Sequence, residues 1–143
     1  MGDSMPKTFI ELADSDRRVA KLVLSLAFSD NDSTLRIAGF HIQQCLEKSL
    51  KALLESLGFD YRGFDNDVET YYRVADALCP ELFSADSQVY IEQNSKIIDS
   101  LAISQSDPST YLYTRHILYG HLVAVERIHN ECSFGVMRCD NRI

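Results

Sequence analysis

The chain has 143 residues, of which 45% are hydrophobic and 24% charged, the composition of one soluble globular domain that needs no disulfide or metal to fold. Its 21 Asp and Glu outnumber its 14 Lys and Arg, and the net charge of −7 argues against broad, charge-driven binding to DNA or an anionic membrane. The four cysteines form no C-x-x-C pair, the N-terminus lacks a signal-peptide pattern, and no apolar run reaches the roughly 20 residues of a membrane span. We expect a cytoplasmic protein.

Apolar residues recur at spacings of three and four along the chain, which indicates helices throughout. Thr8 and Glu11 form a capping-box pair and predict a first helix over residues 9–28. A longer helix is predicted over residues 34–57, because a row of leucines there ends at Gly58, the usual residue just after a helix.

The second half of the chain contains three further predicted helices. They cover residues 67–78, 85–103 and 108–132, the last with Asp107 as N-cap and a proline in its first turn. Residues 133–143 mix glycine, asparagine and charge, and we expect them to fray. The whole chain is thus predicted to be one all-α domain, an antiparallel up-and-down bundle of about five helices with its core over residues 8–132.

Two glycines stand in the middle of long predicted helices, at Gly39 and Gly120. A glycine inside a helix costs about 1 kcal/mol relative to alanine, and close approach of another backbone is the usual compensation. We therefore expect the second and fifth helices to touch at these glycines, within one chain or across a dimer.

The second helix carries a polar stripe beside its leucine row. At 100° per residue one side of the helix receives His41, Gln44, Glu47, Lys48 and Lys51. One interpretation is a solvated helix face in which Glu47 and Lys51 form an i, i+4 ion pair. The other is a polar groove that binds a phosphate or an acidic side chain of a partner.

The stretch Phe40-His41-Ile42-Gln43-Gln44-Cys45-Leu46-Glu47-Lys48-Ser49-Leu50-Lys51-Ala52-Leu53-Leu54 resembles the signature helix of the HEPN domain. The first helix resembles the family's opening motif in Glu11-Leu12-Ala13 and Asp16, followed by apolar residues. The resemblance covers about residues 9–58. It implies a helical bundle, commonly a homodimer, that stands beside or is fused to a minimal nucleotidyltransferase. In other branches of the family it implies a toxin-like, metal-independent endoribonuclease.

The ribonuclease branch carries an arginine followed by a histidine, and Arg115 with His121 fits this pattern with five residues between them. In that branch the arginine steadies phosphate charge and the histidine moves a proton, so no metal is needed. Arg36 and His41 fit the same loose pattern. On a straight helix Arg115 and His121 lie about 120° apart, and His121 falls on the apolar side, which favours a core histidine.

Two tyrosines flank Arg115 at four residues on either side, Tyr111 and Tyr119. In the groove interpretation Arg115 and these two tyrosines line the same groove as the polar stripe. The tyrosines could stack on the guanidinium or on a base, or pack against another helix. Three functions stay open: an accessory domain with a nucleotide- or RNA-related partner, a ribonuclease using Arg115 and His121, and a purely structural dimerisation module. We expect no metal or cofactor, because His and Cys show no ligand spacing and no phosphate-binding loop is present.

Overall fold

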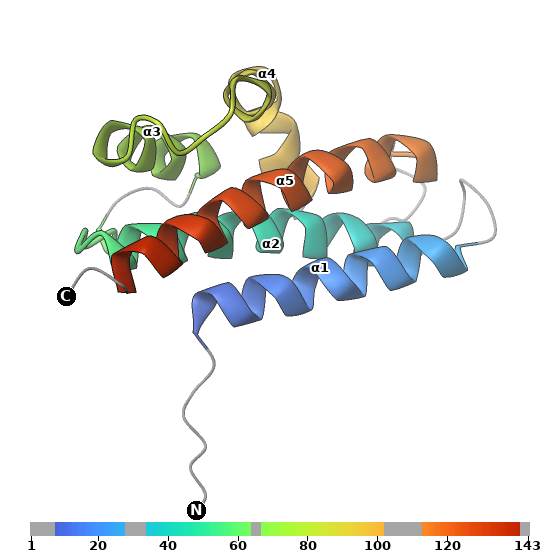
Figure 1. Cartoon of the computed structure of the whole chain (residues 1–143). Helices are drawn as coiled ribbons and strands as arrows, with labels where there is room; N and C mark the ends of the chain where they lie inside the picture. Colours follow the sequence, from blue (N-terminus) through green and yellow to red (C-terminus); the bar gives the residue numbers. More distant parts are fainter. Residues whose placement is uncertain (1–7, 28–33, 64–66, 102–112, 141–143) are drawn as a thin grey trace, which may run out of the picture.

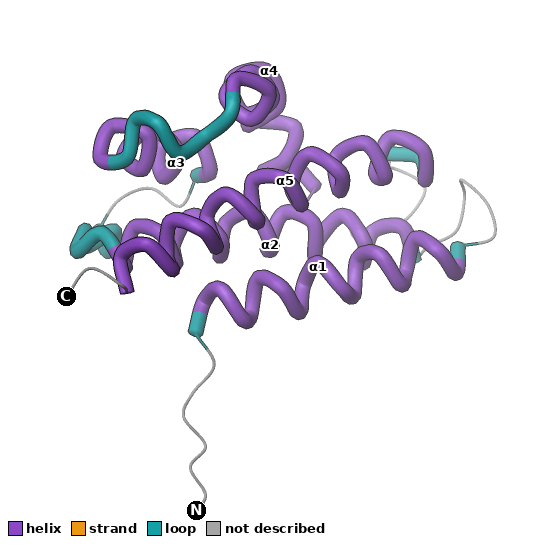
Figure 2. The backbone as a smooth tube through the Cα atoms, viewed as in Figure 1, coloured by secondary structure: helices purple, strands orange, loops and turns teal. Residues whose placement is uncertain are grey.

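The computed structural model describes residues 8–27, 34–63, 67–101 and 113–140. Within these ranges the chain forms five α-helices and no strand, which confirms the predicted all-α class (Figure 2). The helices are α1 (Phe9–Leu26), α2 (Leu35–Ser56), α3 (Val68–Leu78), α4 (Ala85–Leu101) and α5 (Arg115–Asp140).

The three long helices α1, α2 and α5 pack together, and α3 and α4 lie on one side of them (Figure 1). Helix α1 runs opposite to α2, whereas α5 runs in the same direction as α2 because α3 and α4 carry the chain back between them (Figure 1). Helix α2 contacts all four other helices. The predicted leucine row explains this central position, since Leu46, Leu50 and Leu53 are fully buried.

The helix ends follow the expected capping chemistry at three places. The Thr8 hydroxyl accepts a hydrogen bond from the Glu11 backbone N–H at 3.3 Å, and the Glu11 carboxylate accepts one from the Thr8 N–H at 3.2 Å. Gly58 follows Leu57, the C-cap of α2, and adopts a φ of 78°, the left-handed conformation that glycine tolerates best. Ser84 caps α4 by accepting from the Ser87 N–H at 3.2 Å.

The fifth helix differs from its prediction at both ends. Tyr113 and Thr114 are not helical, and the Thr114 hydroxyl accepts a hydrogen bond from Ile117 N–H at 3.3 Å, so α5 begins at Arg115. The predicted start, with Asp107 as N-cap, lies outside the described residues. At the other end α5 continues to Asp140, so the predicted fraying is wrong for residues 133–140.

Gly135 explains why the helix continues through a segment of weak helix formers. It is buried, and a Cβ built on it would lie 2.7 Å from Leu53 Cδ1 and 2.8 Å from Leu82 Cδ2. Tertiary packing against these leucines therefore outweighs the poor helix propensity of glycine.

Only one of the two glycines singled out in the sequence is buried. Gly39 is buried within α2, but Gly120 is exposed, and a Cβ built on it would meet nothing within 4 Å. The expected close contact at Gly120 is therefore wrong within a single chain, because α5 turns that residue toward solvent.

Candidate functional site

The polar side of α2 is joined to α1 through one buried carboxylate, that of Asp16. Asp16 is 6% exposed; its Oδ1 lies 2.6 Å from His41 Nδ1, and its Oδ2 accepts a hydrogen bond from Lys48 Nζ at 2.8 Å. His41 and Lys48 are two helical turns apart on one face of α2, so a single side chain of α1 reaches both. Removing a charged carboxylate from water is unfavourable, so a buried carboxylate needs partners for its oxygens, and His41 and Lys48 provide them here.

Lys51 lies among aromatic rings further along the same face. Its Nζ is 5.9, 5.6 and 5.7 Å from the ring centroids of Phe9, Tyr61 and Tyr71, distances at which a cation is attracted to each ring. It also donates to Glu47 Oε2 at 3.2 Å, which confirms the predicted i, i+4 pair. Lys51 thereby ties the start of α1, the turn after α2 and helix α3 together.

Gln44 links the remaining polar residues of α2. Its Nε2 donates to Gln43 Oε1 at 2.7 Å, and Gln43 Nε2 donates to Glu47 Oε1 at 3.3 Å. The stripe thus forms two hydrogen-bonded groups, one centred on Asp16 and one on Glu47, and each contains a lysine paired with a carboxylate. The side chains of Lys48 and Lys51 remain 25% and 17% exposed, so a second group can still contact their edges.

Arg115 lies at the start of α5, against the end of α1. Its Nε donates to the backbone oxygen of Leu24 at 2.9 Å, satisfying one of the last carbonyls of α1. Its guanidinium carbon lies 5.7 Å from the centroid of the Tyr119 ring, so Tyr119 stacks on Arg115 within one chain. Tyr111, the other flanking tyrosine, lies outside the described residues.

His121 points into the bundle. It is 9% exposed, and its Nδ1 lies 2.6 Å from the hydroxyl of Tyr90 on α4. Burial lowers the pKa of His121 and raises that of Tyr90, so both groups stay neutral at pH 7. Because Arg115 contacts α1 and His121 contacts α4, the described contacts of one chain do not bring the two side chains together.

Sequence reasoning missed a polar cluster centred on His129, between α1, α2 and α5. Ser49 donates its hydroxyl to the Cys45 carbonyl oxygen at 2.7 Å, so it accepts from His129 Nδ1 at 2.9 Å. The other ring nitrogen lies 3.6 Å from Asp14 Oδ1. His129 is 5% exposed, and burial lowers its pKa, with Asp14 opposing that shift.

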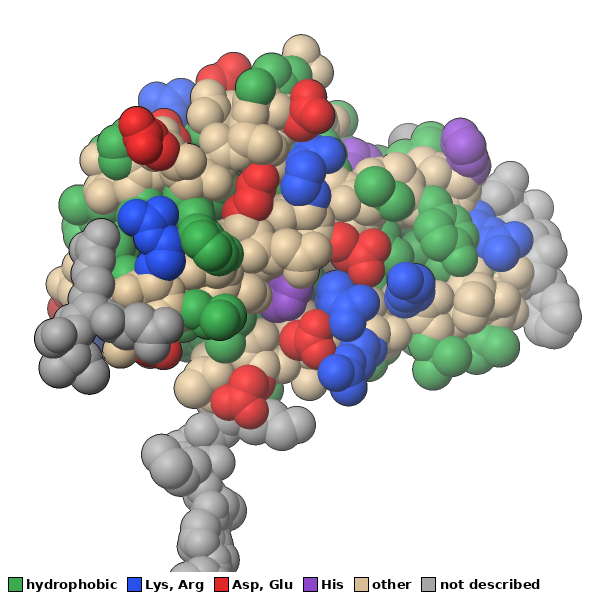
Figure 3. Space-filling model, in the orientation of Figure 1, with side chains coloured by type: hydrophobic (Ala, Val, Ile, Leu, Met, Phe, Trp, Pro, Cys, Tyr) green, Lys and Arg blue, Asp and Glu red, His purple; other side chains and the backbone are tan. Residues whose placement is uncertain are grey.

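Asp14 extends this cluster to the surface. Burial raises the pKa of Asp14, but the hydrogen bond and charge of Arg17 and the charge of Arg18 outweigh it, and the net shift is downward. Arg17 also donates to Glu126 Oε2 at 3.1 Å, which joins α1 to α5. Charged side chains of both signs gather along this seam between α1 and α5 (Figure 3). The sequence signal for this cluster was the i, i+4 spacing of Asp14 and Arg18.

A cavity of about 410 Å³ opens beside the cluster, lined by Ile10, Glu11, Asp14, Ser15, Arg18, His129 and Ser133. Its lining carries two carboxylates, Glu11 and Asp14, and one guanidinium, that of Arg18, which pairs with Asp14 at 2.9 Å. The cavity therefore offers hydroxyls and one imidazole beside an excess of one negative charge.

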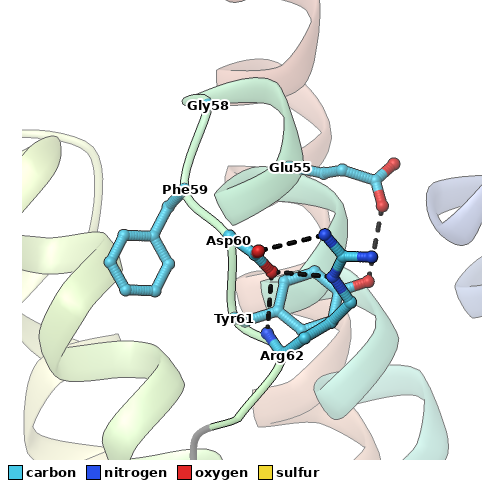
Figure 4. A pocket seen from close by; sticks show the side chains of 6 residues that line it. All are labelled: Glu55, Gly58, Phe59, Asp60, Tyr61 and Arg62. Atoms are coloured by element: carbon cyan, nitrogen blue, oxygen red, sulfur yellow. Dashed lines mark hydrogen bonds and ion pairs between the residues drawn. The ribbon is translucent and has the colours of Figure 1, made fainter.

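A second hollow, of about 330 Å³, lies in the turn that follows α2 (Figure 4). Arg62 pairs there with Asp60 through Nε at 2.9 Å and Nη2 at 3.0 Å, and this hydrogen bonding lowers the pKa of Asp60 to about 2. The Tyr61 hydroxyl donates to Glu55 Oε2 at 3.4 Å. Asp60 and Arg62 neutralise each other, and the Glu55 carboxylate is held by Tyr61, so these contacts organise the backbone of the turn.

Within the described ranges, no group of three or more His, Cys, Asp or Glu side chains is arranged to hold a metal ion. Across the same residues, no helix has the length and hydrophobicity needed to cross a bilayer.

A family model for the HEPN domain matches residues 7–132 of the chain. The match extends the resemblance seen in the first two helices over α3, α4 and most of α5. No curated protein and no solved structure matches the chain.

Proposed function

Because this chain belongs to the HEPN domain family, we propose that it is a helical accessory and interaction domain that acts as a homodimer with a nucleotide- or RNA-related partner in the cytoplasm. A minimal nucleotidyltransferase is the partner class that this proposal favours. The family assignment itself supports the coarser statement, a helical domain that is RNA-related or associated with nucleotidyltransferases.

The proposal is supported chiefly by one observation: the polar residues expected at a catalytic site bond to other side chains of the same bundle. His41 and Lys48 hold Asp16, Lys51 holds Glu47, and His121 is buried against Tyr90. A general acid or base must reach the proton that it transfers. A buried histidine whose pKa is lowered and whose Nδ1 is already bound favours a structural role over proton transfer within one chain.

The exposed edges of the α2 lysines provide the binding surface in this proposal. Lys48 and Lys51 keep part of their side chains accessible, and an acidic side chain or phosphate at this face would accept further hydrogen bonds from their ammonium groups. Nucleotide is the small-molecule candidate and RNA the macromolecular one for this surface.

The first experiment separates the accessory role from catalysis. The purified full chain, Arg115→Ala and His121→Ala are incubated with a mixed, end-labelled RNA pool in EDTA and run on a denaturing gel. The proposal predicts intact RNA in every lane. Cleavage by the parent chain that disappears in Arg115→Ala would establish the toxin-like ribonuclease instead, with a site completed by a second copy.

The second experiment tests the partner. The tagged full chain is cross-linked in its own cells and the captured proteins are identified by mass spectrometry, in parallel with Lys48→Ala and Lys48→Arg. We expect a nucleotidyltransferase whose recovery falls with Lys48→Ala and returns with Lys48→Arg, which keeps the positive charge. If the same amount of nucleotidyltransferase is recovered with Lys48→Ala as with the parent chain, or if only a second copy of the chain is captured, the structural dimerisation module is the function that remains.

A further inference from the structure

The buried imidazole of His129 brings a hydrogen-bond acceptor to the cavity between α1 and α5. Its Nδ1 carries the ring proton, because the Ser49 hydroxyl gives its own proton to the Cys45 carbonyl oxygen and accepts from Nδ1 at 2.9 Å. Burial lowers the pKa of His129, so the ring is neutral at pH 7 and Nε2 keeps a lone pair. His129 lines the cavity although it is only 5% exposed.

The Nε2 lone pair faces a second acceptor. It lies 3.6 Å from Asp14 Oδ1, which is too far for a direct hydrogen bond. The pKa of Asp14 is lowered, so at pH 7 this carboxylate has no proton to give. Among the residues that the structure describes, no other group donates a hydrogen bond to Nε2. Two buried acceptors held side by side are favourable only when a donor contacts both of them.

Ser15 adds a third acceptor to the wall of the same cavity. Its hydroxyl donates to the Glu11 backbone oxygen at 3.2 Å, so the lone pairs of its Oγ are left to accept. The Arg18 guanidinium also lines the cavity, but its Nε is bonded to Asp14 Oδ2 at 2.9 Å and its side chain is 74% exposed. The inner wall is therefore formed mainly by acceptors.

The charges around the cavity favour a cation. Glu11 and Asp14 line it, and Glu126 pairs with Arg17 beside it. Against these three carboxylates stand two guanidiniums, those of Arg17 and Arg18, both paired with Asp14. One negative charge remains in excess, and the chain's net charge of −7 has the same sign.

An ammonium group matches this set of acceptors. It has three N–H donors, no acceptor and one positive charge on a compact head. The cavity has a volume of about 410 Å³, and Ile10 gives it an apolar wall against which an aliphatic chain can lie. A water molecule would also donate to both Nε2 and Asp14, but it fills only about 30 Å³ and carries no charge.

We propose that the cavity between α1 and α5 binds an aliphatic primary amine, whose ammonium group donates to His129 Nε2 and Asp14 Oδ1 and whose methylene chain lies against Ile10. Glu11, three residues before Asp14 on the same side of α1, adds a second negative charge and so favours a diamine over a monoamine. The site uses neither Lys48 nor Lys51, so it goes beyond the proposed function and either can fail alone.

The tautomer of His129 is the first test. The full chain is labelled with ¹⁵N-histidine, its four histidines are assigned from single substitutions to glutamine, and the ring nitrogens are observed by NMR at pH 7. We expect His129 with a proton on Nδ1 and none on Nε2. A proton on Nε2 would let His129 donate to Asp14 itself and would overturn the inference.

Titration with diaminobutane tests the ligand class. At pH 7 and about 0.15 M salt, which screens non-specific attraction, we expect a saturating shift of His129 Nε2 with a Kd of about 1 mM or lower. The signals of His121, whose Nδ1 contacts Tyr90, stay in place. Butanediol has donors without charge, and tetramethylammonium has charge without an N–H donor, so neither should saturate the site. Equal binding of either control would overturn the assignment of an ammonium ligand.

Matched variants, measured by calorimetry, locate the site. Asp14→Asn removes the charge and puts an amide donor beside His129 Nε2, so Kd for diaminobutane should rise by about 10-fold or more. Ser133→Leu fills the cavity, leaves the three acceptors in place and should cause a similar loss. Asp60→Asn removes an equal charge from the turn after α2 and should leave Kd within about twofold.

Circular dichroism of each variant shows that the helices are kept, and Ser133→Leu provides the test by itself if Asp14→Asn does not fold. Diaminobutane that binds Ser133→Leu as tightly as the parent chain would overturn the inference. The same holds if the parent chain shows no binding at all.

Discussion

Replacing Asp16 by alanine removes the carboxylate that joins α1 to α2. The change leaves Lys48 without its partner at 2.8 Å and His41 without its partner at 2.6 Å, both on the central helix. Loss of one member of a buried ion pair costs about 3–5 kcal/mol. The Lys48 and His41 side chains are 25% and 24% exposed, so water compensates part of that loss. We expect Asp16→Ala to lower the free energy of unfolding by about 2–4 kcal/mol.

The assay is thermal and urea unfolding followed by circular dichroism at pH 7. At about 3 °C per kcal/mol for a chain of this size, Asp16→Ala lowers Tm by about 6–12 °C. Asp60→Ala is the matched control, because its ion pair with Arg62 is at the surface, and its Tm stays within experimental error.

A double substitution sharpens the test. Lys48→Met added to Asp16→Ala removes the lysine that would otherwise lose its carboxylate, so we expect recovery of about 1 kcal/mol or more relative to the sum of the single changes. A Tm for Asp16→Ala equal to that of Asp60→Ala, or strict additivity with Lys48→Met, would refute the role assigned to Asp16.

Three further predictions concern other parts of the bundle. Gly135→Val lowers stability by about 1–3 kcal/mol in urea unfolding, because its new atoms overlap two packed leucines; an unchanged midpoint would show that those leucines move freely. Burial lowers the pKa of both His121 and His129 from 6.5, so the unfolded chain binds more protons than the folded one and the free energy of unfolding falls as pH drops below about 6.5. His121→Phe should make the free energy of unfolding depend less steeply on pH. An equally steep dependence in that variant would contradict the burial of a neutral His121. Burial raises the pKa of Cys45 to about 12 and that of Cys132 well above its usual range, so these two thiols should react with a disulfide reagent only after unfolding; rapid labelling of all four cysteines in the native state would disprove their burial.

The helices themselves followed from local rules. The capping box at Thr8 and Glu11, the leucine row of α2 and Gly58 after it all act over one or two turns, so their consequences are visible in a short stretch of sequence. The C-terminal end of α5 could not be predicted from these local rules. Gly135 is a poor helix former by itself and becomes a packing residue only when Leu53 and Leu82 lie against it.

The polar stripe of α2 was partly visible in the same way. Helical periodicity placed His41 and Lys48 on one face, and the i, i+4 rule found the pair of Glu47 and Lys51. The partner of His41 and Lys48 is Asp16 on another helix, and no spacing within α2 contains that information. His129 was missed for the same reason, since Ser49 is 80 positions away in the chain.

The sequence by itself determined the all-α class, the number of helices and the apolar side of each, because periodicity and capping are properties of neighbouring residues. The HEPN motif was equally readable, because it lies within single helices. Only the tertiary structure decided which polar groups are neutralised and which way Arg115 and His121 turn. Those outcomes depend on what another helix places opposite each side chain, and on whether that contact offsets the cost of removing a polar group from water.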